Sequence, residues 1–259
     1  MRVTRIGFTP VKGGRHQEHP YVDLTTTGPV GDRVFCLVDP VRGRVLRTVE
    51  NPTLLQTSAD WHAGVLTATL PGRTVNGVPV PSGETLKVDY WGRVAALEVV
   101  DGPWAAAYSR HLGQDVLLAR ARHPGEVVYG ASVSLVTTAA LGALSRRLSS
   151  PVQAAAFRAT FTIDTGSGSS LDDVSDRAAP CGGSRTVRLG RAEIEVRGAV
   201  PRCAVVDLDP RTGTRAADVL RTLAGYRRSA GGVLFGMDAV VSKPGRVRVG
   251  DAVHTVERG

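Results

Sequence analysis

The stretch GAVPRCAVVDLDPRTG, residues 198–213, places one thiol, Cys203, between an arginine and a short apolar run. The run ends in Asp-Pro-Arg-Thr-Gly, a composition typical of a turn. The apolar spacing of residues 203–210 predicts a strand, and a free cysteine in a strand is ordinarily a small buried side chain. A thiolate beside a guanidinium can instead be a metal ligand. The choice between these interpretations depends on the rest of the chain.

Cysteine usage indicates the cellular compartment. The 259-residue chain has three cysteines, Cys36, Cys181 and Cys203, which are 145 and 22 residues apart and include no Cys-x-x-Cys pair. Such scattered cysteines cannot form an even disulfide framework or a zinc ribbon, so we expect a reducing, cytoplasmic environment. No apolar run approaches the roughly 18 residues of a membrane helix, which predicts a soluble protein with no membrane partner. Cys36 lies within the apolar run VFCLV and is expected in the core.

The charge of the chain raises the question of nucleic-acid binding. The sequence has 32 basic and 24 acidic residues, a net charge of +8, and clustered cations are attracted to phosphate backbones. The basic residues are instead spread as single arginines or short pairs, and aromatic residues make up only 5% of the chain, too few for a stacking platform. We therefore expect no nucleic-acid partner, and we expect a site for a smaller anion.

Short strands punctuated by Gly, Pro, Asp and Asn make up most of the chain. This pattern predicts a mainly β protein with a few helices, an α+β class built of barrels or sandwiches. The predicted strands cover residues 33–40, 64–72, 84–92, 95–102, 133–137, 186–190, 192–198, 203–210 and 246–256. The predicted helices cover residues 102–113, 137–148 and 214–228. Thr137 or Thr138 is the expected N-cap of the second helix.

One polar, Gly/Ser-rich segment, residues 165–184, is long for a loop in a compact domain, so we expect it to be functional or mobile. It carries Cys181, which is either a bystander or a second thiol within reach of Cys203. It also carries Asp172 and Asp173, which could form an acid and base pair, although such a pair in a Ser/Gly loop is ordinarily solvated.

Several motifs follow one another in a fixed order along the chain. They are RIGFTPVKGG (5–14), TTTGPVGDRVFCLVD (25–39), RVLRTVENPTLLQTSA (44–59), a connecting segment (86–119), FRATFTID (157–164), PRCAVVDLDPRTG (201–213), LAGYRR (223–228), VLFGMDAVV (233–241) and GRVRVGDAV (245–253). This series resembles the MOSC family, named for the molybdenum-cofactor sulfurase C-terminal domain. The resemblance covers nearly the whole chain. It implies two β-barrel-like modules, an N-terminal MOSC module over residues 1–100 and a MOSC domain over residues 101–259.

The resemblance also implies an activity and a cofactor. Well-understood members of the family are reductases of N-hydroxylated compounds, which hold a molybdopterin cofactor and reduce an N–O bond by oxygen-atom transfer. The Arg-Cys motif of the family falls on Arg202 and Cys203, so Cys203 is implied as the molybdenum ligand and Arg202 as its catalytic neighbour. A soft thiolate suits a redox metal, and a guanidinium next to it favours the deprotonated form.

Further residues are carried over as cofactor-binding residues. Arginine can bind two oxygens of a phosphate at once, and a helix N-terminus offers free N–H groups to an anion. The implied cofactor-binding residues are Lys12, Arg33 and Arg158, with Arg47, Thr137, Thr138 and Thr160 as further candidates. Without the resemblance, Lys12 is an ordinary turn lysine and Arg33 a surface arginine paired with Asp32.

The chain departs from the family pattern at three places. Gly13 replaces the serine of Pro-Val-Lys-Ser, Thr160 replaces the asparagine of Phe-Arg-x-Asn, and the segment that carries Cys181 replaces an acidic, Trp-containing one. His16 and His19 are spaced like zinc ligands, but no Cys or acidic partner lies at ligand spacing, so no zinc site is expected.

These departures keep two further functions open. One is sulfur transfer or C–S bond chemistry through a persulfide on Cys203 or Cys181, and the other is a cofactor carrier that performs no reaction. The expected partners are a small-molecule substrate and, for redox turnover, a separate electron donor of the ferredoxin or flavin type, because three scattered cysteines cannot hold an iron–sulfur cluster. The alternative to molybdopterin is no cofactor.

Overall fold

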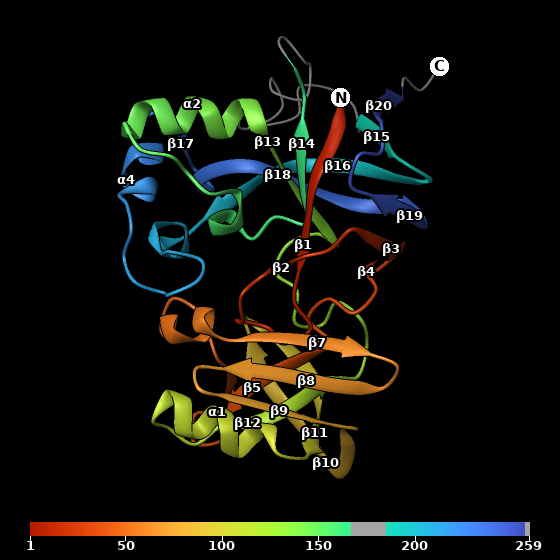
Figure 1. Cartoon of the computed structure of the whole chain (residues 1–259), viewed down its shortest axis with the longest axis vertical. Helices are drawn as coiled ribbons and strands as arrows, with labels where there is room; N and C mark the ends of the chain where they lie inside the picture. Colours follow the sequence, from red (N-terminus) through yellow and green to blue (C-terminus); the bar gives the residue numbers. More distant parts are fainter. Residues whose placement is uncertain (167–184, 257–259) are drawn as a thin grey trace.

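The computed structural model describes residues 1–166 and 185–256. Strands make up 48% of it and helices 16%, which confirms the predicted mainly β, α+β class. The molecule has two halves, one built around a barrel and the other around a large sheet, and the first and last strands, β1 and β20, both lie in the sheet half (Figure 1). No helix among the described residues has the length and apolar character needed to span a bilayer.

The barrel half is formed by strands between residues 35 and 121. Five strands close into a barrel in the order β10-β11-β12-β5-β6. They are β10 (Val80–Tyr90), β11 (Arg93–Asp101), β12 (Leu117–Ala121), β5 (Phe35–Asp39) and β6 (Arg44–Val45). A three-stranded sheet and helix α1 pack beside the barrel; these are β7 (Ser58–His62), β8 (Val65–Leu70), β9 (Arg73–Gly77) and α1 (Trp104–Leu112). Cys36 is fully buried in the barrel core, as predicted.

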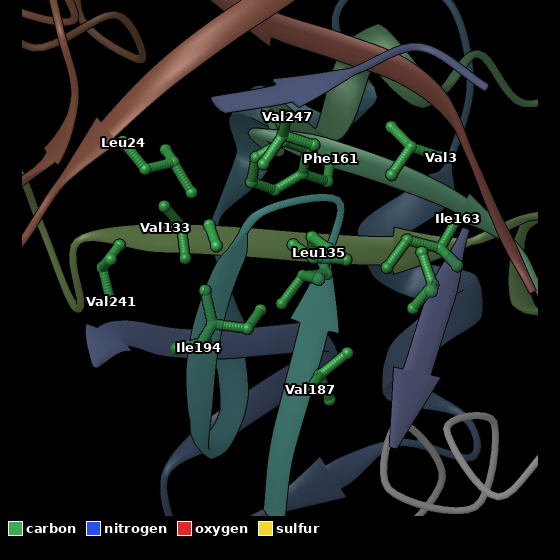
Figure 2. Close-up of a cluster of buried hydrophobic side chains, with 14 of the residues drawn as sticks. Val3, Leu24, Val133, Leu135, Phe161, Ile163, Val187, Ile194, Val241 and Val247 are labelled. Atoms are coloured by element: carbon green, nitrogen blue, oxygen red, sulfur yellow. The ribbon is translucent and has the colours of Figure 1, made fainter. Parts of the chain in front are cut away.

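The other half is a nine-stranded sheet, ordered β2-β1-β14-β13-β18-β16-β15-β20 with β17 paired to β18. Its strands are β1 (Arg2–Phe8), β2 (Gln17–Glu18), β13 (Val133–Thr137), β14 (Phe161–Asp164), β15 (Arg185–Leu189), β16 (Ala192–Arg202), β17 (Arg228–Ser229), β18 (Gly232–Lys243) and β20 (Val253–Val256). Valine, leucine, isoleucine and phenylalanine side chains from these strands form one buried cluster, in which Leu135, Phe161 and Ile194 are fully buried (Figure 2).

The N-terminal segment ties the two halves together. β1 pairs with β14, and β3 (Tyr21–Thr25) pairs with both β4 (Gly28–Pro29) and β19 (Gly245–Arg248), so these strands belong to the sheet half. Between β1 and β3, Val11 packs in the core of the barrel half and bridges to Phe35 of β5. Conversely, β12 lies beyond residue 100 and closes the barrel. The division of the chain at residue 100 stays a prediction.

The predicted helices form where capping residues stand. The Thr137 hydroxyl accepts a hydrogen bond from the Ala140 N–H and begins α2 (Thr138–Leu148), which decides between the two predicted caps. Gly113, at a φ of 65°, ends α1. The third helix, α4 (Val219–Ala224), is shorter than predicted. Its apolar residues pack with those of α2 against one side of β18.

The predicted strand over residues 203–210 is wrong. A short 3₁₀ helix, η3 (Ala204–Asp207), replaces it, with an N–H···O=C bond from Val206 to Cys203. The cause is tertiary: the carboxylate of buried Asp207 accepts from the Leu220 N–H at 2.7 Å, at the start of α4. The carbonyl of Asp207 also accepts from the Ala216 N–H at 2.8 Å, so this segment folds onto the approach to α4 instead of pairing in a sheet.

Candidate functional site

Cys203 is the residue immediately after β16, and its side chain is exposed. Its backbone is extended, with φ −119° and ψ 177°, and its carbonyl accepts the first bond of η3. The interpretation of Cys203 as a core residue is therefore wrong. The end of the long strand and the start of η3 together hold this thiol at the surface, where it can contact another molecule.

The Arg202 side chain joins two backbone segments. Its Nε donates to the Phe235 carbonyl at 2.7 Å and its Nη1 to the Phe157 carbonyl at 2.8 Å. Gly236, at a φ of 72°, leaves the space for this side chain, because a Cβ there would lie 2.9 Å from Nη2 of Arg202 and 2.6 Å from the Leu135 carbonyl. Nη2 is buried and has no hydrogen-bond partner among the described residues. Arg202 thus fixes the segment that leads into Arg158.

Arg158 lies between Cys203 and the N-terminal part of the site. It follows the 3₁₀ helix η2 (Ala154–Phe157) in the left-handed conformation, with a φ of 51°, which is unusual for a residue with a side chain. Burial, followed by the positive charge of Arg33, lowers the pKa of Arg158 to about 10, while Asp32 and Cys203 oppose the shift. The guanidinium is therefore within electrostatic range of both the thiol and the cation of Arg33.

Lys12 and Arg33 are brought together by backbone hydrogen bonds. The Lys12 N–H donates to the Phe35 carbonyl and the Arg33 N–H to the Thr9 carbonyl, both at 2.8 Å. Arg33 forms the predicted ion pair with Asp32, but its side chain is only 16% exposed and that of Asp32 only 2%, so this is an interior pair. Burial, followed by the charges of Arg33 and Arg158, lowers the pKa of Lys12 to about 7. Three cations thus converge on one place.

The remaining predicted cofactor residues have other partners. The Arg47 guanidinium lies 4.3 Å from the ring centroid of Trp91 and 3.8 Å from a Glu50 carboxylate oxygen. The Thr138 hydroxyl donates to Asp164 at 3.1 Å, the Thr160 hydroxyl accepts from the Ser134 N–H at 3.2 Å, and Thr137 caps α2. The structure therefore brings Lys12, Arg33, Arg158, Arg202 and Cys203 together. The side chains of Arg47, Thr137, Thr138 and Thr160 are instead engaged in local contacts.

Residues that the sequence did not single out also face this region. Asp238 lies in mid-strand on β18, where burial raises its pKa and the charges of Arg202 and Arg33 oppose the shift. The Tyr90 hydroxyl is buried and has no partner among the described residues, and the Lys12 Nζ lies 4.8 Å from the centroid of its ring. Nothing local in the sequence marks either residue, because each takes its role from strands that meet in three dimensions.

The turn at the end of the opening stretch joins the two halves. The Asp209 carboxylate accepts from the N–H groups of Arg211 and Thr212 at 2.8 and 2.9 Å. Gly213, at a φ of 74°, has no room for a side chain, because a Cβ would lie 2.1 Å from the Pro52 carbonyl. Gln56 donates to the Thr212 carbonyl at 3.0 Å. The turn thus packs against the barrel half through its backbone.

Two protein-family models together match most of the chain. The model described as MOSC domain matches residues 108–254, and that described as MOSC N-terminal beta barrel domain matches residues 1–102. The chain belongs to the MOSC family. MOSC domains are associated with molybdenum-cofactor sulfurase and reductase-type proteins.

Solved structures give a weaker comparison for this MOSC protein. It is similar to the YUAD protein from Bacillus subtilis, with 11% identity, coverage of 98% of this chain and 94% of that chain, and a TM-score of 0.46. It is also similar to YiiM from Geobacillus stearothermophilus, with 19% identity, coverage of 50% and 56% respectively, and a TM-score of 0.33. A search of curated proteins finds no match.

The residues of this MOSC protein suit a molybdopterin cofactor. An exposed thiol supplies a soft ligand, and the described residues include no group of three or more His, Cys, Asp or Glu side chains able to hold a metal ion. Lys12, Arg33 and Arg158 offer positive charge for an anionic cofactor. Nη2 of Arg202 and the Tyr90 hydroxyl are buried polar atoms that have no partner within residues 1–166 and 185–256. Cys181, Asp172 and Asp173 lie outside the described residues.

Proposed function

We propose that this MOSC protein is a molybdenum-cofactor oxidoreductase that reduces N-hydroxylated small molecules, with Cys203 as the molybdenum ligand. One observation carries the proposal: the thiol of the family's Arg-Cys motif is exposed at a point where Arg158 links it to Lys12 and Arg33. When bound, the cofactor would supply two-electron oxygen-atom transfer from an N–O bond.

The proposed roles of the chain's residues follow from their contacts. Cys203 would bind the metal as a thiolate, and the Arg158 guanidinium would stabilise its negative charge. Arg202 acts on this site as a positioning residue, because its hydrogen bonds to Phe157 and Phe235 fix the backbone that carries Arg158. Lys12 and Arg33 would bind anionic groups of the cofactor.

Lys12 has a second proposed role as a proton donor. Its pKa of about 7 in the ligand-free protein means that it changes protonation state near neutral pH. A bound anion favours the charged ammonium, so cofactor binding would raise this pKa and load the side chain with a proton. A reduction that releases water consumes protons, and Lys12 is placed to hold one beside the cofactor.

The decisive experiment is metal and pterin analysis of protein purified from a molybdopterin-producing host. We expect stoichiometric molybdenum and extractable pterin in the wild type, loss of molybdenum in Cys203→Ser, and retention in the matched thiol variant Cys36→Ala. N-hydroxyl reduction with a chemical reductant should fall about 100-fold or more in Cys203→Ser. Molybdenum-free wild-type protein, or a fully active Cys203→Ser variant, would rule the proposal out.

Several finer expectations belong to the same proposal. We propose a separate ferredoxin- or flavin-type electron donor, a cytoplasmic location, and a division into modules over residues 1–100 and 101–259. Electron transfer from candidate donors to the molybdenum-loaded protein would test the first. Separate expression of the two segments would test the last, and the pairing of β1 with β14 and of β12 with β5 leads us to expect that neither half folds alone.

Exposure of the Cys203 thiol also favours a second candidate function, sulfur transfer. In that case Cys203 would carry a persulfide, and the neighbouring guanidinium of Arg158 would stabilise its anion. Intact-protein mass spectrometry after incubation with an organic trisulfide, whose sulfane sulfur can pass to the Cys203 thiolate with release of a thiolate, separates the two functions. A reductase should show no adduct, whereas a sulfur carrier should gain the mass of one sulfur atom, which is lost in Cys203→Ser.

A further inference from the structure

The hairpin of β1 and β2 carries two buried polar side chains that the proposed mechanism does not use, Arg5 and His16. Gly7 pairs with Glu18 across this hairpin. Alternate residues of a strand share a face, so Arg5, Gly7 and Glu18 lie on the same side of the hairpin, and His16 directly precedes β2. The hairpin begins to turn just beyond Lys12, which places this face next to the site described above.

The Arg5 guanidinium lies over Gly7. A Cβ at Gly7 would be 2.4 Å from Nη1 and 2.6 Å from Nη2, so the absence of a side chain at this position creates the space that the guanidinium fills. Its Nε donates to Glu18 at 3.0 Å, but Nη1 and Nη2 are buried and have no partner among the described residues. The Gly7 N–H donates to the Thr160 carbonyl at 2.9 Å, so these unpaired N–H groups lie beside the segment that carries Arg158.

His16 has the same property. It is 6% exposed, and both ring nitrogens are buried with no hydrogen-bond partner among the described residues. Burial, followed by the charges of Arg158, Arg33 and Arg5, lowers the pKa of His16 well below its usual range, so the ring is neutral and offers one N–H donor. His16 is thus electrostatically coupled to the arginines of the site as well as to Arg5.

The chemistry of these groups specifies their ligand. Arg5 offers N–H donors only, and the nearest acid, Glu18, is 74% exposed, so its charge is largely screened by water. Burying donors without partners destabilises the folded protein, and apolar side chains would fill the same space at lower cost. A ligand rich in hydrogen-bond acceptors and carrying negative charge satisfies all of the unpaired groups together.

We propose that Arg5 and His16 form a subsite for an oxyanion of the substrate, a carboxylate or a phosphate monoester, so that the N-hydroxylated substrates of this protein are anionic. This inference rests on the proposed reductase function for the reacting group, but the oxyanion subsite itself does not depend on turnover. Lys12 and Arg33 remain the residues proposed to bind the cofactor, and Arg5 and His16 are a separate pair of buried donors.

A matched pair of substrates tests the inference in the molybdenum-loaded protein. Benzamidoxime is neutral and 4-carboxybenzamidoxime is anionic, and both carry the same N–O bond. We expect Arg5→Met and His16→Phe to raise KM for the carboxylated compound about tenfold or more and to leave kcat and the neutral substrate unchanged. Arg2→Met, an exposed arginine on the same strand, is the control. Equal loss on both substrates, or no change on either, would overturn the inference.

A binding measurement separates this inference from the proposed function. Isothermal titration of the purified protein with inorganic phosphate and with 4-carboxybenzamidoxime needs no turnover. We expect the affinity for both compounds to fall about tenfold in Arg5→Met and to fall less in the milder variant Arg5→Lys. If molybdenum and pterin content falls in the Arg5 variants, the oxyanion is the cofactor's own phosphate and the substrate assignment is wrong. If turnover is absent but Arg5-dependent binding persists, the oxyanion subsite stands and the reductase function fails.

Discussion

Strands of the N-terminal segment pair with later strands at two places, and the arginines at these places differ in burial and in hydrogen bonding. Between β3 and β19, Arg246 binds Asp23 through two hydrogen bonds of 2.8 and 2.6 Å, and both side chains are more than 40% exposed. At the pairing of β1 with β14, Arg5 keeps buried N–H groups without partners among the described residues, and Arg202 at the end of β16 does the same. The pKa of Arg246 is raised by its hydrogen bond to Asp23, whereas that of Arg158 is lowered by burial to about 10.

This difference separates a structural contact from a binding site. An exposed arginine that forms an ion pair is satisfied in the folded protein, and the pair contributes little to its stability. Buried arginines that lack partners destabilise the fold until a ligand of opposite charge arrives, and perturbed groups of this kind concentrate at functional sites. Removal of the Arg246–Asp23 pair should therefore lower stability slightly and leave ligand binding unchanged. Removal of a buried arginine at the site should weaken ligand binding and raise the stability of the ligand-free protein.

Replacement of Arg158 gives the sharpest test of this contrast. We expect Arg158→Met to reduce cofactor retention about 10- to 100-fold, because it removes the cation that links Cys203 to Lys12 and Arg33. The cofactor-free variant should be more stable than wild type, by about 1–3 kcal/mol in urea unfolding, because a buried charge is lost. Arg146→Met, at an exposed position on α2, is the control. A less stable variant that keeps its cofactor would contradict the contrast.

Gly213 tests whether the two halves are held together by backbone packing more than by charge. Gly213→Ala introduces a Cβ 2.1 Å from the Pro52 carbonyl at a φ of 74°, so we expect a loss of about 2–3 kcal/mol in free energy of unfolding. The control is Gly231→Ala, where a Cβ meets open space. Thermal unfolding measures both variants, and equal midpoints would show that the turn can move away from the barrel half.

Lys12 predicts a pH dependence of the empty site. Its folded pKa of about 7 lies below its ordinary value of 10.5, so between these pH values the unfolded chain binds one more proton than the folded chain. Stability should therefore rise with pH from about 7 towards 10.5, and Lys12→Met should flatten this rise and stabilise the cofactor-free protein most below pH 7. Exposed Lys87→Met is the control. Parallel pH profiles of wild type and Lys12→Met would show that Lys12 is not the group responsible.

The smallest effect is expected at the paired contact. The hydrogen bond from Arg246 lowers the pKa of Asp23 below its usual 3.8, so its contribution to stability is present above that pH and disappears as the pH falls through the lowered value. Asp23→Asn should lower the unfolding midpoint at pH 7 by no more than about 2 °C, compared with the exposed control Asp101→Asn. Cofactor content should stay unchanged in Asp23→Asn. A loss of molybdenum in this variant would contradict the assignment of the Arg246–Asp23 pair to structure alone.

The sequence by itself determined the features that depend on local patterns. Alternating apolar residues located strands such as β8 and β13, Thr137 and Gly113 marked helix ends through capping, and the apolar neighbours of Cys36 placed it in the core. The order of motifs identified the family and pointed to Cys203. These signals are readable because each depends on residues a few positions apart.

Only the tertiary structure decided which polar groups share a site. The exposure of Cys203 follows from Asp207 binding the start of α4, and Arg202 reaches Phe157 across β18 because Gly236 makes room. The fold buries nitrogens of Arg5 and His16 where no described residue offers them a hydrogen bond. A sequence records which groups can donate or accept, but whether each one has a partner depends on segments distant in the chain, and packing alone brings those together.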